Sequence, residues 1–304
     1  MKHTLLMQPQ PASVDVAINA YGKPYQTAIT LLTLLKHSGQ WIDKIYFVEE
    51  RKQPEPVDFK FIFKMLGQGK IIYYRPLFWF WYKQVNQFLQ KFGLYRRAIR
   101  YQYAWEKTDK KFLLIIHNDL YFSGDLVGEY LKNIGDHTGI GKIGQCWNCP
   151  AHSAGLCDGD RYLNYRPSYE EIMRLNEQYP GPPRSKFYAE YIEKDRPWPL
   201  PECRLNEYVA LVNLEKAKPD TVPYGKATPF GIINVIDVGV AWFHQLNNEG
   251  HTFANFDYDP YVTHSWVSLK NAGHEALFNK DLYKYEEEVA LKVLKEEFGY
   301  QPAK

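Results

Sequence analysis

A run of apolar residues leads directly into a histidine, an asparagine and an aspartate. Residues 112–116 are apolar throughout, which predicts a strand buried on both faces, and His117, Asn118 and Asp119 follow it without a break. Ligands of open α/β sheets bind beyond the carboxyl ends of the strands. An aspartate there can hold a divalent metal ion, and the alternative is a loop or helix-capping aspartate. Asp119 is therefore the first candidate for chemistry, with Asn118 beside it.

Polar side chains also follow the first two predicted strands. Asn19 and Tyr21 close the first strand, and Glu49 and Glu50 close the second. Parallel strands bring these ends to one edge, where an amide and several acids would suit a nucleoside diphosphate carrying Mg²⁺ or Mn²⁺. Neither a Walker motif nor a G-x-G-x-x-G loop follows the first strand, so the metal and side chains would have to hold the diphosphate. Solvated loop charges are the alternative for the two glutamates.

Two arginines precede the buried strand, on a helix predicted over residues 95–107. Arg97 and Arg100 could reach the diphosphate from there. The alternative, and the favoured one, is the solvated basic face of a helix.

The four cysteines form a second signal. Cys146, Cys149, Cys157 and Cys203 are all the cysteines of the chain and lie in one stretch. In a reducing compartment, a C-x₂-C pair with two further thiols matches a four-ligand structural zinc site, with His152 as a substitute ligand. Four unrelated buried thiols, or a redox pair at the C-x₂-C, remain open alternatives. Zinc here would be structural, separate from a catalytic ion, and would hold a segment whose own apolar pattern is thin.

The elements that must position these residues are those of an α/β chain. Apolar patterns predict strands at 14–19, 42–48, 70–74, 112–116 and 141–147, and helices at 24–38, after 82 to 92, at 95–107 and at 124–134. Alternation of strands and helices predicts a Rossmann-like, mostly parallel sheet flanked by helices. From 149 to about 231, Pro, Tyr, Arg and charges predict a loop-rich insertion. A strand at 232–237, a helix to 249, an extended stretch at 261–267 and a helix at 282–298 follow.

The order of these pieces resembles a nucleotide-sugar-dependent glycosyltransferase of the GT-A fold, of the inverting glycosyltransferase family 2 type. The resemblance covers residues 14–150 and, more weakly, 232–268. It implies one GT-A domain over 1–304, with a donor half at 14–150, the loop-rich insertion at 150–231 and an acceptor-side segment at 232–304. That family holds its metal with an Asp-x-Asp motif, of which this chain keeps only Asp119. The resemblance also implies a second metal contact at His264, for which a structural histidine is the alternative.

An inverting transferase needs a general base for the acceptor hydroxyl. The resemblance implies a carboxylate ahead of a helix, and Asp237 is the first candidate, with helix capping as its alternative. Glu207 is the rival, with Arg204 and Asn206 nearby to bind acceptor hydroxyls or an anionic group. The implied reaction is metal-dependent transfer of a hexosyl or related sugar to a glycan or glycolipid, as in polysaccharide biosynthesis. A nucleotidyltransferase and a non-catalytic binding module organised by zinc are the alternatives.

Composition and the length of the apolar runs indicate which binding partners and which cellular compartment to expect. The 304 residues carry a net charge of +2, which argues against a dedicated nucleic-acid binder. Aromatic residues make up 16% of the chain. This high content is typical of surfaces that bind sugars or flat rings, but a well-packed hydrophobic core also explains it. No apolar run spans a bilayer and the amino-terminal apolar stretch is too short for a signal peptide, so we expect a cytoplasmic protein. The aromatic run 77–82 with its basic neighbours could contact the inner face of a membrane, although packing on the sheet is favoured.

Overall fold

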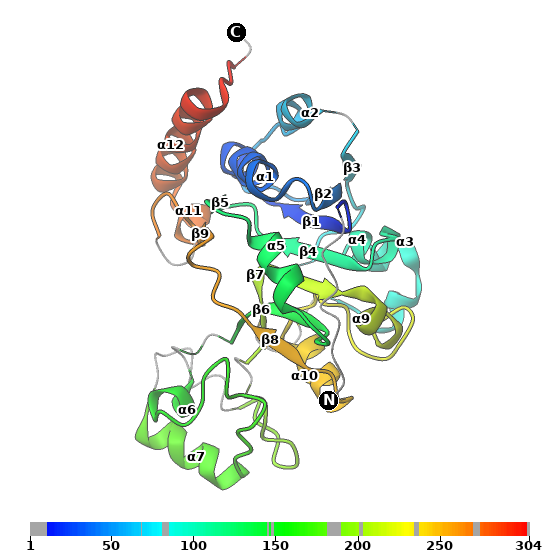
Figure 1. Cartoon of the computed structure of the whole chain (residues 1–304), viewed down its shortest axis with the longest axis vertical. Coiled ribbons are helices and arrows are strands. Elements are labelled where there is room, and N and C mark those ends of the chain that lie inside the picture. The colour runs from blue at the N-terminus through cyan, green and yellow to red at the C-terminus, as the bar shows by residue number, and fades with distance from the viewer. Residues whose placement is uncertain are drawn as a thin grey trace.

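Seven strands form one mostly parallel sheet in the order β3-β2-β1-β4-β7-β6-β8 (Figure 1). The computed structural model describes residues 11–302 except 68, 81–84, 145, 147–148, 181–189, 201–202, 234–236 and 270–273. The strands are β1 Val14–Ala20, β2 Ile42–Glu49, β3 Ile71–Tyr74, β4 Phe112–Ile116, β6 Gly139–Ile143, β7 Leu205–Asn213 and β8 Phe253–Asn255. Strand β7 runs antiparallel to both of its neighbours, and the other adjacent pairs are parallel.

Strand β4 lies in the middle of the sheet and is apolar on both faces. Leu114 and Ile116 contribute to one hydrophobic core, and Leu113 and Ile115 to the other. Because both faces of this strand are covered, alternation of polar and apolar residues is lost. The prediction of a doubly buried strand that ends at the candidate aspartate is confirmed.

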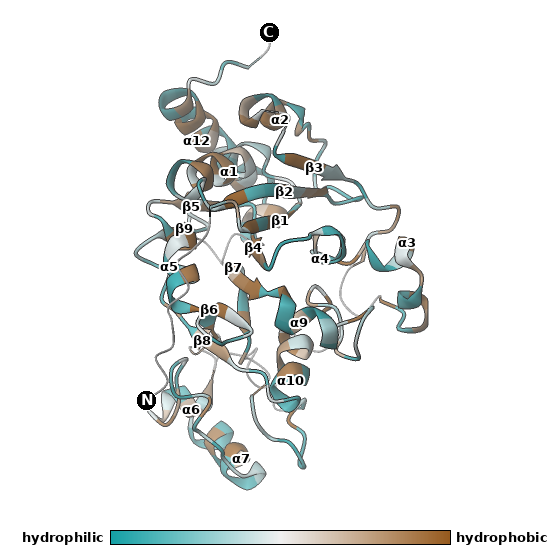
Figure 2. Cartoon of the chain, turned by 45° about the vertical axis from the view of Figure 1, so that its right-hand side comes forward, coloured by the Kyte–Doolittle hydropathy of each residue, from teal (hydrophilic) through white to brown (hydrophobic). Residues whose placement is uncertain are grey.

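Helices cover both faces of the sheet, which gives three layers (Figures 1 and 2). One face packs against α1 Pro24–Ser38, α2 Lys60–Leu66, α5 Leu126–Asn133 and α12 Lys280–Phe298, and the other against α4 Gln102–Lys107, α9 Leu214–Asp220 and α10 Val240–Asn248. On the second face, the rings of Trp105 and Trp242 meet edge to face with centroids 5.8 Å apart. Helix α1 covers the predicted range 24–38, with Pro24 at its first position and Gly39 directly after its last residue. The fold class is therefore α/β with a mostly parallel sheet.

A small second sheet completes the edge of the main one. Strands β5 Leu120–Phe122 and β9 Val262–His264 pair antiparallel, with Leu120 opposite His264. Because β5 begins one residue after Asp119, this register brings the end of β9 to the end of β4. The confirmed extended stretch near residue 262 thus delivers a histidine to the candidate aspartate.

Several predicted elements differ from the structure. The helix predicted over 95–107 is broken into α3 Gly93–Arg96 and α4, because Tyr101 has a φ of 62° that no right-handed helix accommodates. Before it, the described residues contain a 3₁₀ helix at Phe88–Lys91, where an α-helix reaching 92 was predicted. Strand β6 begins at Gly139 and ends at Ile143, earlier than predicted.

The loop-rich segment is shorter than its composition suggested. Strand β7 and helix α9 lie inside the range 150–231 that was predicted to be an insertion. The segment between β6 and β7 carries α6 Pro150–Ser153 and α7 Tyr169–Gln178 and forms a lobe beyond the end of β6 (Figure 1). The strand predicted over 232–237 is not formed at Ile232 and Ile233, and 234–236 lie outside the described residues. Helix α11 His274–Phe278 precedes α12.

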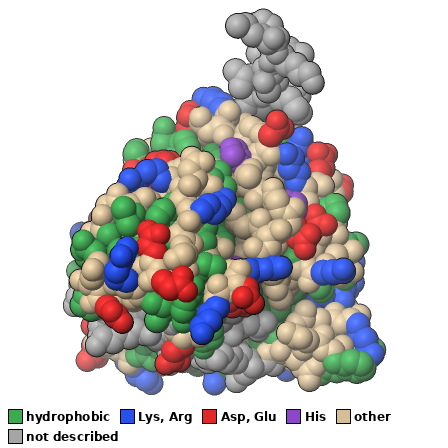
Figure 3. All heavy atoms as spheres, turned by 90° about the horizontal axis from the view of Figure 1, so that it is seen from below, with side chains coloured by type: hydrophobic (Ala, Val, Ile, Leu, Met, Phe, Trp, Pro, Cys, Tyr) green, Lys and Arg blue, Asp and Glu red, His purple; other side chains and the backbone are tan. Residues whose placement is uncertain are grey.

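The surface carries no dominant charge on the face that Figure 3 shows, where acidic and basic side chains alternate with apolar ones. Residues 81 and 82 of the predicted aromatic run lie outside the described residues. Leu77 and Phe78, at the start of the run, are exposed rather than packed on the sheet. Within the described ranges, no helix has the length and hydrophobicity that crossing a bilayer requires.

Candidate active site

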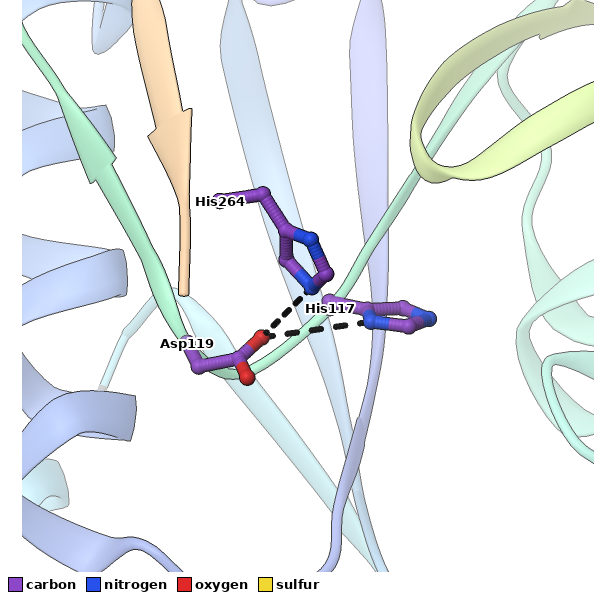
Figure 4. A group of neighbouring side chains, drawn as sticks. All are labelled: His117, Asp119 and His264. Carbon is purple, nitrogen blue, oxygen red and sulfur yellow. Dashed lines mark ion pairs between the residues drawn. The ribbon is translucent and has the colours of Figure 1, made fainter. Parts of the chain in front are cut away.

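Three side chains from two strand ends converge at the carboxyl edge of the sheet (Figure 4). His117 and Asp119 follow β4, and His264 ends β9. Asp119 Oδ1 lies 3.3 Å from His264 Nε2 and 3.9 Å from His117 Nδ1. One ligand atom from each residue lies within 4.8 Å of the other two. Two imidazole nitrogens and a carboxylate oxygen form a donor set that a transition metal ion can occupy.

The carboxylate of Asp119 is buried, and its two oxygen atoms have different surroundings. Its Oδ2 accepts a hydrogen bond from Lys23 Nζ at 2.8 Å, while its Oδ1 is buried and accepts none. Burial alone would raise the pKa of Asp119, but the Lys23 ammonium, His264 and His117 hold it well below its usual range. Asp119 therefore stays ionised, with Oδ1 turned toward the two imidazoles. This orphaned oxygen between two histidines fits a metal ion.

Neighbouring groups orient the two imidazoles. The ring of His264 stacks on Tyr208 of β7, with centroids 3.8 Å apart and planes 22° apart. The edge of His117 meets the same tyrosine at 4.9 Å. His117 Nε2 lies 3.8 Å from Glu207 Oε1, on the side away from Asp119. A carboxylate on the far side of an imidazole is the usual partner of a metal-binding histidine.

Sequence reasoning missed Lys23 and His117. Lys23 lies in the turn Gly22-Lys23-Pro24, directly before the helix predicted over 24–38, and 96 positions separate it from Asp119. Its positive φ of 52° turns the chain just before α1. His117 is the first residue of the stretch His117-Asn118-Asp119, at the position where the Asp-x-Asp motif has its first acid. This position was the signal that could have identified it. Both follow from contacts that pattern alone does not show.

A second group of charges surrounds a buried arginine. The Arg204 side chain has no exposed surface and lies 3.1 Å from Glu207 Oε2 and 2.9 Å from Asp237 Oδ2. Burial raises the pKa of Glu207 to about 7, against the lowering effect of Arg204. The Asp237 side chain is 24% exposed, compared with 5% for Glu207, so only Asp237 offers an open carboxylate. Asn206 Oδ1 accepts a hydrogen bond from the Tyr208 backbone N–H at 3.0 Å.

This arrangement places the buried Arg204 guanidinium against both carboxylates, which it orients. Acceptor binding by Arg204 and Asn206 stays a prediction. Helix α10 begins at Val240 after Gly239, so Asp237 lies ahead of the helix cap. Its Oδ1 accepts a hydrogen bond from the Val238 backbone N–H at 2.9 Å.

A pocket opens beside these groups, at the ends of β1 and β2. Asn19, Glu50 and Arg100 supply its polar lining, and Trp79 with neighbouring aromatic residues supplies an apolar wall. Arg100 Nε and Trp79 Nε1 each donate to one Glu50 oxygen at 2.9 Å. Asn19 Oδ1 accepts from the backbone N–H of Tyr101 at 2.9 Å. The structure therefore brings together three of the residues predicted at this edge.

Tyr21 lies within reach of the Glu50 charge at this pocket. Burial and the Glu50 carboxylate both raise the pKa of Tyr21. Other predicted donor residues are engaged elsewhere. Glu49 contacts Tyr73 and Arg75, at 2.8 and 3.2 Å. Arg97 pairs with Glu106 at 2.9 Å. Asn118 Nδ2 donates to Gly22 O and Thr27 Oγ1, so it fastens the turn before α1.

The four cysteines line a separate pocket at the base of the loop-rich lobe. Cys146, Cys149, Cys157 and Cys203 all border it, together with His152 and Trp198. None forms a disulfide. Among the described residues, the group that brings three possible ligand atoms within 4.8 Å of one another is His117, Asp119 and His264. The four thiols are therefore spaced more widely around their pocket.

No protein-family model matches the chain, and no curated protein matches it. Solved structures that resemble it include a mannosyltransferase from Pyrobaculum calidifontis in complex with GDP-mannose and Mn²⁺, at a TM-score of 0.47 and 8% identity, over 97% of this chain and 77% of that one. The galactosyltransferase LgtC with donor and acceptor sugar analogues aligns at 0.42 and 12% identity, over 80% and 73%. Mouse xyloside xylosyltransferase 1 aligns at 0.41 and 13% identity, over 81% and 84%.

Proposed function

We propose that this chain is a metal-dependent glycosyltransferase that uses a nucleotide-sugar donor. The observation that carries the proposal is the joint placement of a metal-competent group, a polar pocket and an arginine-held carboxylate pair at one edge of the sheet. These parts are close together, since the charges of Glu207, Glu50 and Asp119 all act on the buried Tyr101 hydroxyl and, with burial, raise its pKa. A ligand with a ring, a diphosphate and a sugar would span such a site.

The donor set suits Mn²⁺ better than Mg²⁺. His117, Asp119 and His264 would hold the ion, and Mg²⁺ strongly prefers oxygen ligands whereas imidazole suits transition metals. When bound, the ion supplies charge neutralisation for the leaving nucleoside diphosphate. Lys23 keeps Asp119 ionised and fixes its Oδ2, so that Oδ1 stays directed at the site.

Asp237 is the proposed general base. In an inverting transfer, the acceptor oxygen bonds to the anomeric carbon as the bond to the diphosphate breaks, and the hydroxyl proton passes to a carboxylate. The partial exposure of Asp237 gives an acceptor access, and Arg204 fixes its orientation. Glu207 instead faces His117 and would hold that imidazole in the orientation that a metal ligand needs.

The pocket formed by Asn19, Glu50 and Arg100 is the proposed site for the nucleoside. The adjacent Trp79 ring offers an apolar wall for a base, and the engaged Glu50 carboxylate fixes both Arg100 and Trp79. Glu49 lies on the β3 side and provides a matched control.

A lipid-linked glycan is the acceptor that the surface supports best. Five large apolar side chains are exposed among the described residues from 77 to 94, and Phe78 also lines the nucleoside pocket: Leu77, Phe78, Phe88, Phe92 and Leu94. Lys91 Nζ lies 3.4 Å from the centroid of the Phe88 ring, so a cation accompanies this apolar group. Aromatic residues beside a lysine suit peripheral contact with an anionic membrane surface. Co-sedimentation with anionic vesicles, lost in Phe88→Ser, would support this acceptor, and equal sedimentation of both proteins would reject it.

The function is tested with a panel of nucleotide sugars, with and without Mn²⁺. At least one should raise the melting temperature only when Mn²⁺ is present, because a ligand of the folded state stabilises it. Asp119→Asn and Glu50→Gln should lose this gain, and Glu49→Gln should keep it. Released product identifies the reaction: a nucleoside diphosphate supports sugar transfer, pyrophosphate supports a nucleotidyltransferase, and neither product nor stabilisation rejects the proposal.

The roles of the two carboxylates separate by binding and turnover. Asp237→Asn should retain Mn²⁺ and donor binding and lose transfer. Glu207→Gln should instead weaken Mn²⁺ binding, because its partner is His117. The reverse pattern would make Glu207 the base.

A further inference from the structure

The sheet itself brings two of the four cysteines together. Strands β6 and β7 pair antiparallel with Ile143 opposite Leu205. Cys146 comes three residues after Ile143, and Cys203 comes two residues before Leu205. The Gly144 backbone N–H donates to the Arg204 carbonyl at 2.6 Å, so the two chain segments are joined at this point. The lobe therefore leaves and re-enters the sheet between these two thiols.

A short turn supplies the other two cysteines. The Cys149 backbone N–H donates to the Cys146 carbonyl at 3.0 Å, which folds the C-x₂-C segment back on itself. Helix α6 follows, and the backbone N–H groups of Leu156 and Cys157 both donate to the Ala151 carbonyl, at 2.9 and 3.2 Å. His152 Nδ1 lies 3.2 Å from the Cys157 carbonyl oxygen, so this ring nitrogen is engaged with the turn. The chain thus closes around one pocket with sulfur on several sides.

We propose that Cys146, Cys149, Cys157 and Cys203 bind one structural zinc ion. All the thiols of the chain border a single pocket, in the arrangement of a C-x₂-C turn with two further ligands. Binding would draw the sulfur atoms inward to the tetrahedral arrangement that zinc requires. The inference is independent of the proposed transfer reaction, because the pocket lies apart from the His117 site.

The lining of the pocket favours a metal over a redox pair. Reactive C-x₂-C cysteines are activated by neighbouring positive groups that stabilise the thiolate. Among the described residues that line this pocket there is no lysine or arginine, and Asp158 places a carboxylate beside the thiols. Such thiols become thiolates when a divalent cation binds between them.

The zinc ion would also help to position residues at the edge of the sheet. Cys203 precedes Arg204, which holds Glu207 and Asp237. His244 of α10 fixes the same turn, since its Nε2 lies 3.1 Å from the carbonyl oxygens of both Leu200 and Cys203. A metal at Cys203 would therefore anchor the turn that positions the buried arginine.

Metal content of the full-length protein tests the proposal. Protein purified without chelator should contain about one zinc per chain, and its thiols should react with a disulfide reagent only after the zinc is removed. Replacement by Co²⁺ should give a thiolate-to-cobalt charge-transfer band. Cys149→Ser should lose the zinc, whereas Asp119→Asn should keep the zinc while losing Mn²⁺ binding.

Two results would overturn the proposal. One is wild-type protein without zinc whose four thiols react freely and give no cobalt band. The other is a disulfide between Cys146 and Cys149 in protein that retains its fold without metal. Because both use the wild-type chain, neither depends on whether a cysteine variant folds, and neither depends on transferase activity.

Discussion

Removal of either partner of the buried Lys23–Asp119 ion pair should destabilise this chain strongly. The Lys23 Nζ to Asp119 Oδ2 distance is 2.8 Å, and the two side chains are only 4% and 6% exposed. Removing one partner of such a pair leaves a buried charge and costs about 3–5 kcal/mol. At about 2.1 cal/mol/K of unfolding entropy per residue, 4 kcal/mol lowers the melting temperature of 304 residues by about 6 °C.

A double-mutant cycle measures the pair itself. Asp119→Asn and Lys23→Met should each destabilise the protein, and the double variant should cost less than their sum by about 2 kcal/mol, because it buries no unpaired charge. Asp119→Asn should be the milder of the two, since Lys23 also faces Glu286 and Glu287. Chemical denaturation in a chelator gives the four free energies of unfolding without any contribution from bound metal.

The surface pair of Lys142 and Asp259 provides the control. Its nitrogen and oxygen are also 2.8 Å apart, but its side chains are 32% and 64% exposed. Exposed pairs contribute below about 1 kcal/mol. If the Lys23–Asp119 coupling is no larger than the coupling in this control pair, burial does not strengthen the contact and the reasoning fails.

Three further outcomes are expected. His264→Ala should weaken Mn²⁺ binding by about a hundredfold, at least as much as loss of an outer-shell partner does, and an unchanged Mn²⁺ titration would remove it from the site. Arg204→Met should cost about 3 kcal/mol in urea unfolding, because Glu207 and Asp237 lose their common cation. Arg204→Lys should recover only part of this, since one ammonium cannot serve both carboxylates. Burial lowers the pKa of His244 to about 4, so the folded chain leaves it neutral while the unfolded chain protonates it. The free energy of unfolding should therefore fall by about 1.4 kcal/mol per pH unit from about pH 6.5 down to 4, a slope that His244→Gln should lack.

Local patterns sufficed for the first half of the sheet. Strand β1, helix α1 and strand β2 follow from apolar spacing, with Pro24 and Gly39 as boundaries, and β4 follows from an unbroken apolar run. Strand β7 could not be recognised in the same way. Its first half contains Asn206 and Glu207, which are polar because they line the site, and its partners are distant in sequence.

The candidate site was predictable where a strand led into it or where the family resemblance covered it. Asp119 was found from the end of a predicted strand and His264 from the resemblance, whereas Lys23 reaches Asp119 through the path of α1 across the sheet. Arg100 and Arg97 were predicted together because both belonged to one expected helix. Helix α3 instead ends at Arg96, and Arg100 forms a β-bridge with Gly231, so Arg100 lines the pocket while Arg97 contacts Glu106.

The junction of β6 and β7 makes the lobe between them an exchangeable module. Its two ends meet where Ile143 pairs with Leu205, so a tight turn and a whole lobe are equally compatible with the same sheet. Lengthening a loop is cheap, at about 0.6 kcal/mol for each doubling. Insertions at this junction could therefore be gained, lost or replaced during evolution while the order of the strands stays the same. For protein engineering, a foreign domain grafted at this point would have to replace the buried side chains, such as Tyr162 and Ile172, that the lobe packs into the second core.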